Sequence, residues 1–325
     1  MGHVHGGPDA LGVPRWDFST NANACGPCPQ ALAAVQRADA RHYPDPAYAA
    51  LCAALAAFHG VEPERIVLAG SASEFIGRIS AAVAFGGGSM VWLPDLAYGD
   101  YAQAARAWGL ARTRDPARAH LRWLCEPSSP LGLPEALAAS VVRPGGVVVL
   151  DRAYEPLRLS GRSSLDADAL DRVWQLWTPN KALGLTGVRG AYAIAPTDGQ
   201  PLAQRLNQLA PSWPLGAHAV AMMTAWVQPQ TQAWLAQSRA QLALWKGAMR
   251  TSLEARGWHV RNSEANYFCA RTPQPIDPVR LRAQGIKLRD TTSMGLPRHW
   301  RLGVLPLPAQ AALLAALALQ LEVIP

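Results

Sequence analysis

The sequence predicts an α/β protein whose larger part is a mainly parallel β-sheet with helices packed on both faces. Short apolar segments alternate with segments of helical periodicity over the first two thirds of the chain, as in repeated strand–helix units. One apolar segment, residues 146–150, is the continuous run Gly-Val-Val-Val-Leu, which is typical of a strand buried on both faces. The length of 325 residues corresponds to about two domains of roughly 150 residues each.

Turn residues and the spacing of apolar side chains predict the individual elements. Pro29 suits the first position of a helix over residues 30–39, and the run Tyr43-Pro44-Asp45-Pro46 ends that helix. The other expected elements, in chain order, are a helix over residues 47–59, a strand over 65–69, a helix over 71–84, a strand over 89–93, a helix over 101–108, the buried strand over 146–150, a long helix over 217–253, strands over 258–261 and 267–270, and a closing Ala/Leu helix from residue 309.

The pattern changes after about residue 210, where the alternating units give way to the long helical segment and shorter strands. This change predicts a second, smaller α+β domain. We expect a large domain over residues 41–210 and a small domain over residues 211–325, with an N-terminal segment over residues 1–40 that joins the small domain.

Composition excludes several classes of protein. Half of the residues are hydrophobic and 16% are charged, which excludes general disorder. The net charge of +7 comes from Arg residues scattered along the chain without a dense basic run, so we do not expect nucleic-acid binding. No apolar stretch reaches the roughly 20 residues that span a bilayer, so we do not expect a membrane protein.

The N-terminus and the cysteines predict a cytoplasmic protein. The first residues carry no basic segment followed by an apolar one, so no secretory signal is visible. The five cysteines are an odd number, and we expect them to be free thiols in a reducing compartment.

Two of these cysteines form the run Cys25-Gly26-Pro27-Cys28, which has the spacing of a thioredoxin-type redox pair. That chemistry requires a buried strand before the first thiol, and the preceding residues are instead the polar turn Asn-Ala-Asn-Ala. A single pair at this spacing is also a poor zinc site, so we expect a loop before a helix and no metal.

Three groups of residues point to chemistry when they are taken together. Asp151 follows the buried strand at its carboxyl end, where α/β sheets place their ligand crevices. Lys181, in Thr178-Pro179-Asn180-Lys181, lies thirty residues later, and Arg189 lies eight residues beyond it in an apolar, Gly-rich segment. Apolar surroundings suit these cations only if an anionic and an electrophilic group lie nearby. Pyridoxal phosphate supplies both groups, and its ring nitrogen pairs with a carboxylate.

These residues belong to a longer series of segments that resembles the aspartate aminotransferase superfamily of pyridoxal-phosphate enzymes. Within it the sequence is similar to the threonine-phosphate decarboxylases of cobalamin biosynthesis, with the histidinol-phosphate aminotransferases as the nearest neighbours. The resemblance covers nearly the whole chain, from His5-Gly6-Gly7 to the C-terminal helix. Its other segments are Asp17-Phe18-Ser19-Thr20-Asn21, Tyr43-Pro44-Asp45-Pro46, Leu68-Ala69-Gly70-Ser71-Ala72-Ser73-Glu74, Leu150-Asp151-Arg152-Ala153-Tyr154, the segment around Lys181, Ala265-Asn266-Tyr267 and Leu288-Arg289-Asp290.

The resemblance implies a pyridoxal-phosphate site with defined roles. Lys181 would bind the cofactor covalently through its aldehyde, Asp151 would pair with the pyridinium nitrogen, and Tyr154 would hydrogen-bond the ring hydroxyl. The remaining implied cofactor contacts are the ring-stacking Tyr98, the phosphate-binding backbone of Ser71, Ala72 and Ser73 at the start of a helix, the phosphate ligands Thr178, Asn180 and Arg189, and Tyr43 of the other subunit. The last contact implies a homodimer with shared active sites.

Substrate residues are implied in the same way. Arg301 matches the arginine that binds the substrate carboxylate, for which the bidentate guanidinium is well suited. The residues that match the substrate-phosphate end of the decarboxylases are His5, Gly6, Asn21 and Arg289. The implied activity is decarboxylation of O-phospho-L-threonine to an aminopropanol phosphate, and the alternative is amino transfer on histidinol phosphate.

Two segments depart from the family pattern: residues 126–132, and the glycine-rich phosphate turn, which is shorter and richer in Ser than usual. Relatives carry Asn-Pro-Asn-Asn-Pro-Thr-Gly where this chain has Glu-Pro-Ser-Ser-Pro-Leu-Gly over residues 126–132. The Asn that bonds the ring hydroxyl in relatives is therefore Ser129 here, a shorter group with a single hydroxyl. Lys181, Asp151 and Arg189 are retained, so we expect an active enzyme.

Overall fold

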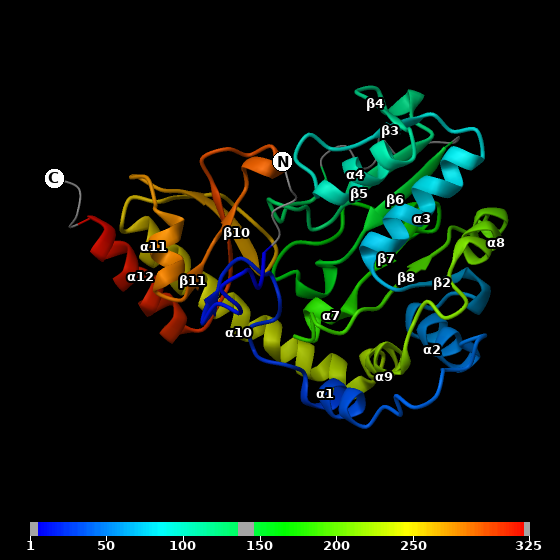
Figure 1. Cartoon of the computed structure of the whole chain (residues 1–325), viewed down its shortest axis with the longest axis horizontal. Helices are drawn as coiled ribbons and strands as arrows, with labels where there is room; N and C mark the ends of the chain where they lie inside the picture. The colour runs from blue at the N-terminus through cyan, green and yellow to red at the C-terminus, as the bar shows by residue number, and fades with distance from the viewer. Residues whose placement is uncertain (1–5, 136–145, 322–325) are drawn as a thin grey trace.

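The structure, a computed structural model, describes residues 6–135 and 146–321. It has two lobes, which Figure 1 shows on the left and right. The larger lobe is built on a seven-stranded sheet with the strand order β2-β8-β7-β6-β5-β3-β4. Strand β8 runs antiparallel to both of its neighbours, and the other pairings are parallel. The strands are β2 (Ile66–Ala69), β3 (Met90–Trp92), β4 (Ala111–Thr113), β5 (Leu121–Cys125), β6 (Val147–Asp151), β7 (Trp174–Trp177) and β8 (Ala191–Ile194).

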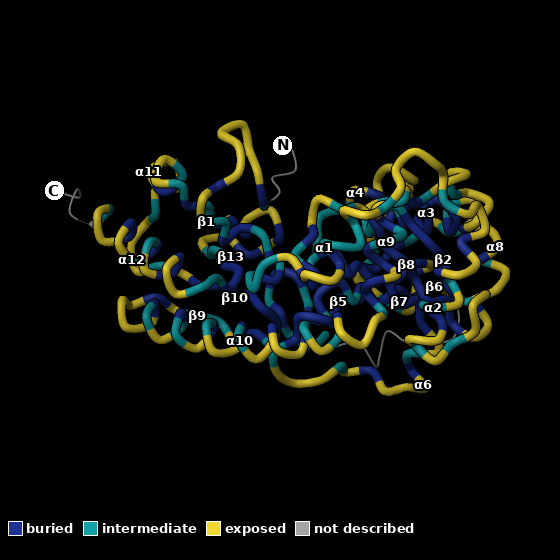
Figure 2. The backbone as a smooth tube through the Cα atoms, turned by 90° about the horizontal axis from the view of Figure 1, so that it is seen from below, coloured by how far each residue is buried: buried dark blue, intermediate teal, exposed yellow. Residues whose placement is uncertain are grey.

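Both faces of this sheet are covered because apolar side chains point alternately to either side of its strands. In β2, Ile66 and Leu68 pack in one hydrophobic cluster, whereas Val67 and Ala69 pack in another. The first cluster includes α1 (Pro29–Gln36), α2 (Ala49–His59) and α9 (Ala217–Trp226); the second includes α3 (Ala72–Phe85), α4 (Gly99–Ala107) and α8 (Gln200–Leu209). The predicted α/β class with a mostly parallel sheet is thus confirmed, and strands β2, β5, β6, β7 and β8 lie in the buried interior of Figure 2.

The long helix expected over residues 217–253 is two helices, so that prediction was wrong. Helix α9 ends at Trp226 and α10 (Pro229–Glu254) starts three residues later. The proline ring at the start of α10 disfavours helical backbone in the preceding residue, and Gln228 is extended, with ψ of 139°. Helix α9 packs against α1, and α10 runs on to contact β9 and α12 in the smaller lobe.

The smaller lobe contains a four-stranded antiparallel sheet with the order β12-β13-β10-β9. Its strands and helices are β9 (His259–Val260), β10 (Tyr267–Arg271), β12 (Arg289–Asp290), β13 (Trp300–Gly303), α11 (Pro278–Ala283) and α12 (Leu307–Leu321). The N-terminal segment joins this lobe through β1 (Trp16–Asp17), which pairs in parallel with β11 (Ile286–Lys287). The domain limits at residues 40 and 210 stay a prediction.

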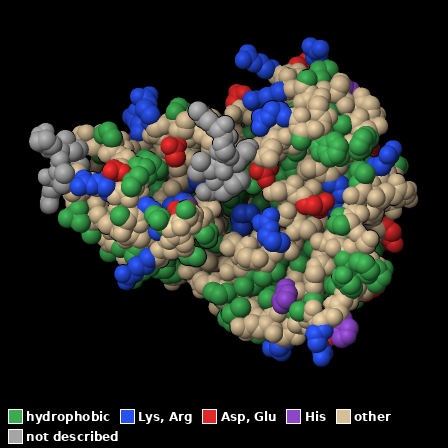
Figure 3. Space-filling model, viewed as in Figure 1, with side chains coloured by type: hydrophobic (Ala, Val, Ile, Leu, Met, Phe, Trp, Pro, Cys, Tyr) green, Lys and Arg blue, Asp and Glu red, His purple; other side chains and the backbone are tan. Residues whose placement is uncertain are grey.

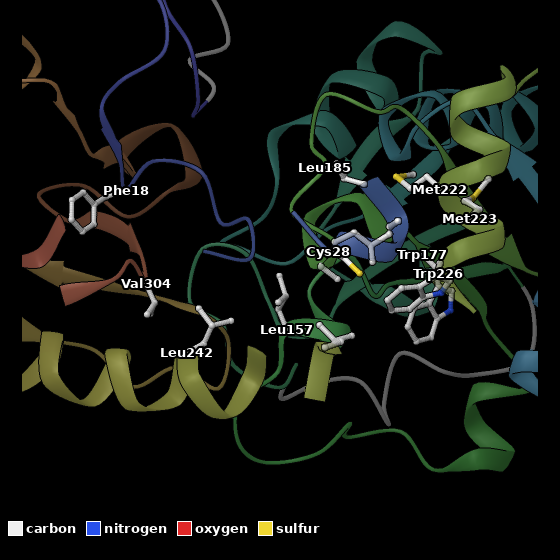
Figure 4. Packing of buried hydrophobic residues seen from close by; sticks show 14 of the residues in the cluster. Phe18, Cys28, Leu157, Trp177, Leu185, Met222, Met223, Trp226, Leu242 and Val304 are labelled. Atoms are coloured by element: carbon white, nitrogen blue, oxygen red, sulfur yellow. The ribbon is translucent and has the colours of Figure 1, made fainter. Parts of the chain in front are cut away.

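One hydrophobic cluster is continuous between the lobes. It extends from Phe18 and Val304 through Leu242 of α10 to Trp177 and Trp226 in the larger lobe, as Figure 4 shows. Among the described residues, no helix is both long enough and apolar enough to cross a bilayer.

Candidate active site

The site forms where several strands of the large sheet end along one edge. Strands β5, β6 and β7 are parallel, and Cys125 pairs in register with Asp151, which pairs with Leu176. Strand β2 ends at the same edge, where Ser71 starts helix α3. The segments after these strands therefore meet in one place, at the position where α/β sheets bind ligands.

Asp151 lies fully inside the lobe and accepts two hydrogen bonds. Its Oδ2 accepts from the Tyr101 hydroxyl at 2.6 Å, and its Oδ1 accepts from the backbone N–H of Ala153 at 2.9 Å. Burial raises the pKa of Asp151, and the bond from Tyr101 opposes that shift. The Tyr101 ring is held by stacking on Trp123, with ring centroids 4.4 Å apart. Asp151 is thus a rigid buried carboxyl group that one hydroxyl partly stabilises as an anion.

Lys181 lies on the short helix α7 (Pro179–Ala182), directly after β7. Its Nζ is 5.4 Å from the centre of the Tyr154 ring. The Tyr154 hydroxyl accepts a 3.3 Å hydrogen bond from the Asn21 side chain. Asn180 donates to the backbone carbonyl of Val188, which ties the lysine helix to the segment that carries Arg189. These bonds bring a primary amine, a phenol and a guanidinium to one side of the site.

The start of helix α3 also lines the site. Ser71 caps this helix by accepting a 3.1 Å hydrogen bond from the backbone N–H of Glu74. The Ser73 hydroxyl donates at 2.5 Å to Asp100, a carboxylate at the start of α4. Burial raises the pKa of the nearby Tyr98 hydroxyl, so this phenol is neutral over the physiological range. Backbone N–H groups at the start of a helix of this length favour anions.

These residues line one cavity. Its lining includes Ser71, Ala72, Ser73, Tyr98, Ser129, Asp151, Tyr154, Thr178, Asn180, Lys181 and Arg189, all of which the sequence singles out. Tyr101 and Cys125 line the same cavity, and the sequence did not single them out as site residues. Tyr101 was assigned only to a helix, because nothing in its local sequence shows that it faces Asp151.

A second, wider cavity of about 550 Å³ adjoins the first and shares Lys181, Tyr154 and Arg189 with it. It is lined by the predicted substrate residues Gly6, Asn21, Arg289 and Arg301. Figure 3 shows Lys and Arg side chains in the hollow between the lobes. Asp100 and Gln103 of helix α4 also line this cavity, and the sequence did not single them out.

Two buried guanidinium groups stand side by side in this second cavity. Arg289 of β12 lies directly opposite Arg301 of β13, and each residue is 6% exposed. Their hydrogen bonds go to neutral groups: Arg301 donates to Ser129 Oγ at 3.1 Å and to the Ser19 carbonyl at 3.3 Å, and Arg289 donates to Ser293 Oγ at 3.1 Å. Burial and the neighbouring Arg301 lower the pKa of Arg289. Like charges opposite each other destabilise a sheet, so this pair suits a ligand with anionic groups.

Three residues of the sequence hypotheses, Tyr43, Cys25 and Cys28, lie outside both cavities. Tyr43 is 76% exposed and stacks on Trp213, with ring centroids 4.3 Å apart, outside both cavities. His5 lies outside the described residues. Cys28 is buried among apolar side chains (Figure 4) and Cys25 is partly buried; both are free thiols.

The described residues fit pyridoxal phosphate. The cavity contains the primary amine of Lys181, which suits the aldehyde of that cofactor, and the buried carboxylate of Asp151, which suits its ring nitrogen. The start of helix α3 and the Arg189 guanidinium line the same cavity and suit its phosphate. The Thr178 hydroxyl is buried without a hydrogen-bond partner among the described residues, so it is free to bind a phosphate oxygen.

The chain belongs to the aminotransferase class I and II family, whose model matches residues 15–125 and 123–317. The predicted aspartate aminotransferase-like fold is confirmed, and the predicted cofactor agrees with this family.

Individual relatives and solved structures show which enzymes of this family the chain resembles. Histidinol-phosphate aminotransferase 1 of Thiobacillus denitrificans is 31% identical over 90% of this chain and 83% of its own length. The structure of histidinol-phosphate aminotransferase from Sinorhizobium meliloti in complex with pyridoxal-5'-phosphate covers 92% of this chain and 88% of its own, with TM-score 0.75 and 23% identity. The structure of L-threonine-O-3-phosphate decarboxylase from Porphyromonas gingivalis covers 94% of this chain and 99% of its own, with TM-score 0.79 and 19% identity.

Proposed function

We propose that this protein is a pyridoxal-phosphate enzyme that acts at the amino-bearing carbon of a small phosphorylated substrate. The observation that carries the proposal is a pair of adjoining cavities that share Lys181. One of them contains Asp151 and the helix start at Ser71, and the other contains Arg289 and Arg301. When bound, the cofactor supplies an aldehyde for covalent attachment and a conjugated ring that accepts the electron pair of a bond broken at the substrate carbon.

The residues of the first cavity hold and tune the cofactor in this proposal. Lys181 is the one primary amine among the described residues that line the two cavities, so it binds the aldehyde and moves protons at Nζ. Asp151 holds a proton on the ring nitrogen, because a buried carboxylate stabilises an adjacent cation. The Tyr154 hydroxyl orients the ring hydroxyl, and Arg189 and Thr178 bind the phosphate.

The residues of the second cavity select the substrate. Arg289 and Arg301 lie opposite each other across the β12–β13 pair, and no carboxylate of the described residues is hydrogen-bonded to them. A ligand with two anionic groups compensates both buried cations, which also orients the amino-bearing carbon relative to Lys181. The substrate class is therefore a small amine that carries phosphate, carboxylate or both.

Amino transfer on histidinol phosphate has the stronger support from relatives, because curated relatives from several bacteria are named histidinol-phosphate aminotransferases. The two arginines suit both substrates of such a reaction. The phosphorylated amine carries one anionic group, and a dicarboxylate amino acceptor carries two. Lys181 would then carry the proton that leaves the substrate carbon.

Decarboxylation of O-phospho-L-threonine is the second candidate, and the paired arginines favour it. That substrate carries a carboxylate and a phosphate in one small molecule, so both buried guanidinium groups are compensated at once. A solved decarboxylase with this fold, from Porphyromonas gingivalis, is among the structural neighbours.

One experiment separates the two reactions. The purified protein, loaded with pyridoxal phosphate, is incubated with histidinol phosphate plus 2-oxoglutarate and, separately, with O-phospho-L-threonine alone. Amino transfer forms glutamate and requires the oxo acid, whereas decarboxylation releases carbon dioxide without it. Failure of the loaded protein to convert either substrate would contradict the proposed substrate class.

We also propose a homodimer with shared active sites. The exposed, stacked Tyr43–Trp213 pair, which is anchored by a 3.1 Å hydrogen bond from Trp213 to the Pro44 carbonyl, presents a large aromatic surface. Sedimentation of the parent and of Tyr43→Ala tests this: a parent that sediments as a monomer would contradict the proposal.

A further inference from the structure

An ion-pair cluster fastens the N-terminal segment to the smaller lobe. The Asp9 carboxylate receives two parallel hydrogen bonds from Arg282, from Nε to Oδ2 and from Nη2 to Oδ1, each 2.9 Å long. The Nζ of Lys287 lies 3.0 Å from the same Oδ2. Hydrogen bonds from Arg282 and then from Lys287 hold the pKa of Asp9 well below its usual range. Asp9 is therefore ionised at neutral pH.

The two cations also hold the backbone on either side of Asp9. Lys287 Nζ donates to the Gly7 carbonyl at 2.6 Å, and Arg282 Nη2 donates to the Gly12 carbonyl at 2.9 Å. The side chains of Arg282 and Lys287 are 13% and 17% exposed. An isolated exposed ion pair contributes little, but a bidentate arginine within a partly buried network is the exception. We name Asp9, Arg282 and Lys287 the N-terminal clamp.

The clamp is connected to the substrate cavity through a short series of hydrogen bonds. The Gly7 N–H donates to Ser19 Oγ at 2.9 Å, and the Ser19 carbonyl accepts from Arg301 Nη2 at 3.3 Å. Gly6 itself lines the cavity. A Cβ at Gly6 would lie 2.2 Å from the Ser19 carbonyl oxygen, so the two backbones are in direct contact.

We propose that the N-terminal clamp holds residues 6–12 so that Gly6 forms part of the wall of the substrate cavity and Ser19 stays in place against Arg301. Asp9, Arg282 and Lys287 are then positioning residues that control substrate affinity without touching the substrate. Without the clamp, the bond between Gly7 and Ser19 would be the main hydrogen bond, among the described residues, that attaches residues 6–12 to the rest of the lobe. The effect on substrate affinity rests on the proposed function, because it takes the cavity as the substrate site.

The test compares the loaded parent protein with Asp9→Asn and with Asp171→Asn as a matched control. Asp171 also pairs with an arginine distant in sequence, Arg65, at 2.8 Å, but it lines neither cavity. The rate of amide hydrogen exchange over residues 6–21 measures how firmly this segment is held, and the measurement needs no substrate. We expect at least tenfold faster exchange there in Asp9→Asn and parental exchange in Asp171→Asn.

Steady-state kinetics then show whether holding residues 6–12 in place increases the affinity for the substrate. We expect KM for the substrate that the parent converts to rise about tenfold in Asp9→Asn, with kcat within twofold and the cofactor absorbance unchanged. Lys287→Arg should retain parental KM, whereas Lys287→Met should reproduce the rise. Parental exchange in Asp9→Asn, or faster exchange with an unchanged KM, would overturn the proposal. If the parent converts neither candidate substrate, the proposed function fails, and the exchange experiment still decides whether the clamp holds the wall.

Discussion

The hydroxyl of Tyr101 donates a 2.6 Å hydrogen bond to Oδ2 of Asp151, and the two residues lie fifty positions apart in the sequence. This bond supplies the buried carboxylate with its one side-chain donor among the described residues. It lowers the pKa of Asp151 against the larger effect of burial, so it helps to keep the carboxylate charged.

Tyr101→Phe should lower kcat about tenfold and leave the fold intact. The phenyl ring keeps the stacking on Trp123, but Asp151 loses its side-chain donor and its pKa rises. A hydrogen bond to a charged group contributes about 1.5–3 kcal/mol, and about 1.4 kcal/mol corresponds to tenfold in rate. The measurement is the pH profile of kcat, whose acidic limb should move to higher pH. Tyr48→Phe, which removes a buried hydroxyl bonded to the Leu215 carbonyl, is the control. An unchanged profile in Tyr101→Phe would show that the bond does not tune Asp151.

Lys181→Ala should abolish turnover and covalent attachment of the cofactor. The chain contains only three lysines, Lys181, Lys246 and Lys287, so borohydride reduction followed by peptide mapping identifies the attachment site without ambiguity. Lys246 is buried against backbone carbonyls and Lys287 belongs to the N-terminal clamp. Label on either of these lysines in the parent protein would refute the assignment.

Ser129→Ala should raise KM about tenfold, because Arg301 Nη1 loses its 3.1 Å acceptor and a hydrogen bond to a charged group contributes about 1.5–3 kcal/mol. Ser129→Asn should stay within a few-fold of the parent, since an amide oxygen can also accept from Arg301. Substrate kinetics and cofactor titration of both variants test this pair of expectations. Cofactor binding more than tenfold weaker in Ser129→Asn would instead indicate overpacking around the larger side chain.

Lys246 should make the protein more stable as the pH rises above 8. Burial lowers its pKa from 10.5 to about 8, and its Nζ donates to the Ser263 and Ala265 carbonyls. Between pH 8 and 10.5 the unfolded chain keeps a proton that the folded protein has released, so the free energy of unfolding increases with pH. The slope is at most about 1.4 kcal/mol per pH unit. Denaturant unfolding gives the free energy of unfolding of the parent and of Lys246→Met over this pH range. The difference between the two free energies should grow with pH, and a constant difference would contradict the expectation.

The sequence by itself determined the fold class and the local chemistry of the site. The apolar run over residues 146–150 corresponds to the central strand β6 (Val147–Asp151), and Asp151 ends it at the edge where the cavity lies. Thr178, Asn180, Lys181 and Arg189 could be singled out because they lie close together in a segment that resembles the lysine segment of the aspartate aminotransferase superfamily. Pro29 at the start of α1 and Ser71 at the cap of α3 were likewise predictable from local backbone preferences.

Only the tertiary structure decided which distant residues meet. Tyr101 faces Asp151 because α4 packs beside α3 over the sheet, and Arg289 faces Arg301 because β12 pairs with β13 in one register. The clamp of Asp9 with Arg282 and Lys287 joins residues more than 270 positions apart. Such contacts depend on packing and strand register over the whole chain, whereas the local pattern of a sequence reports only which side chains are near in the chain and which face is apolar.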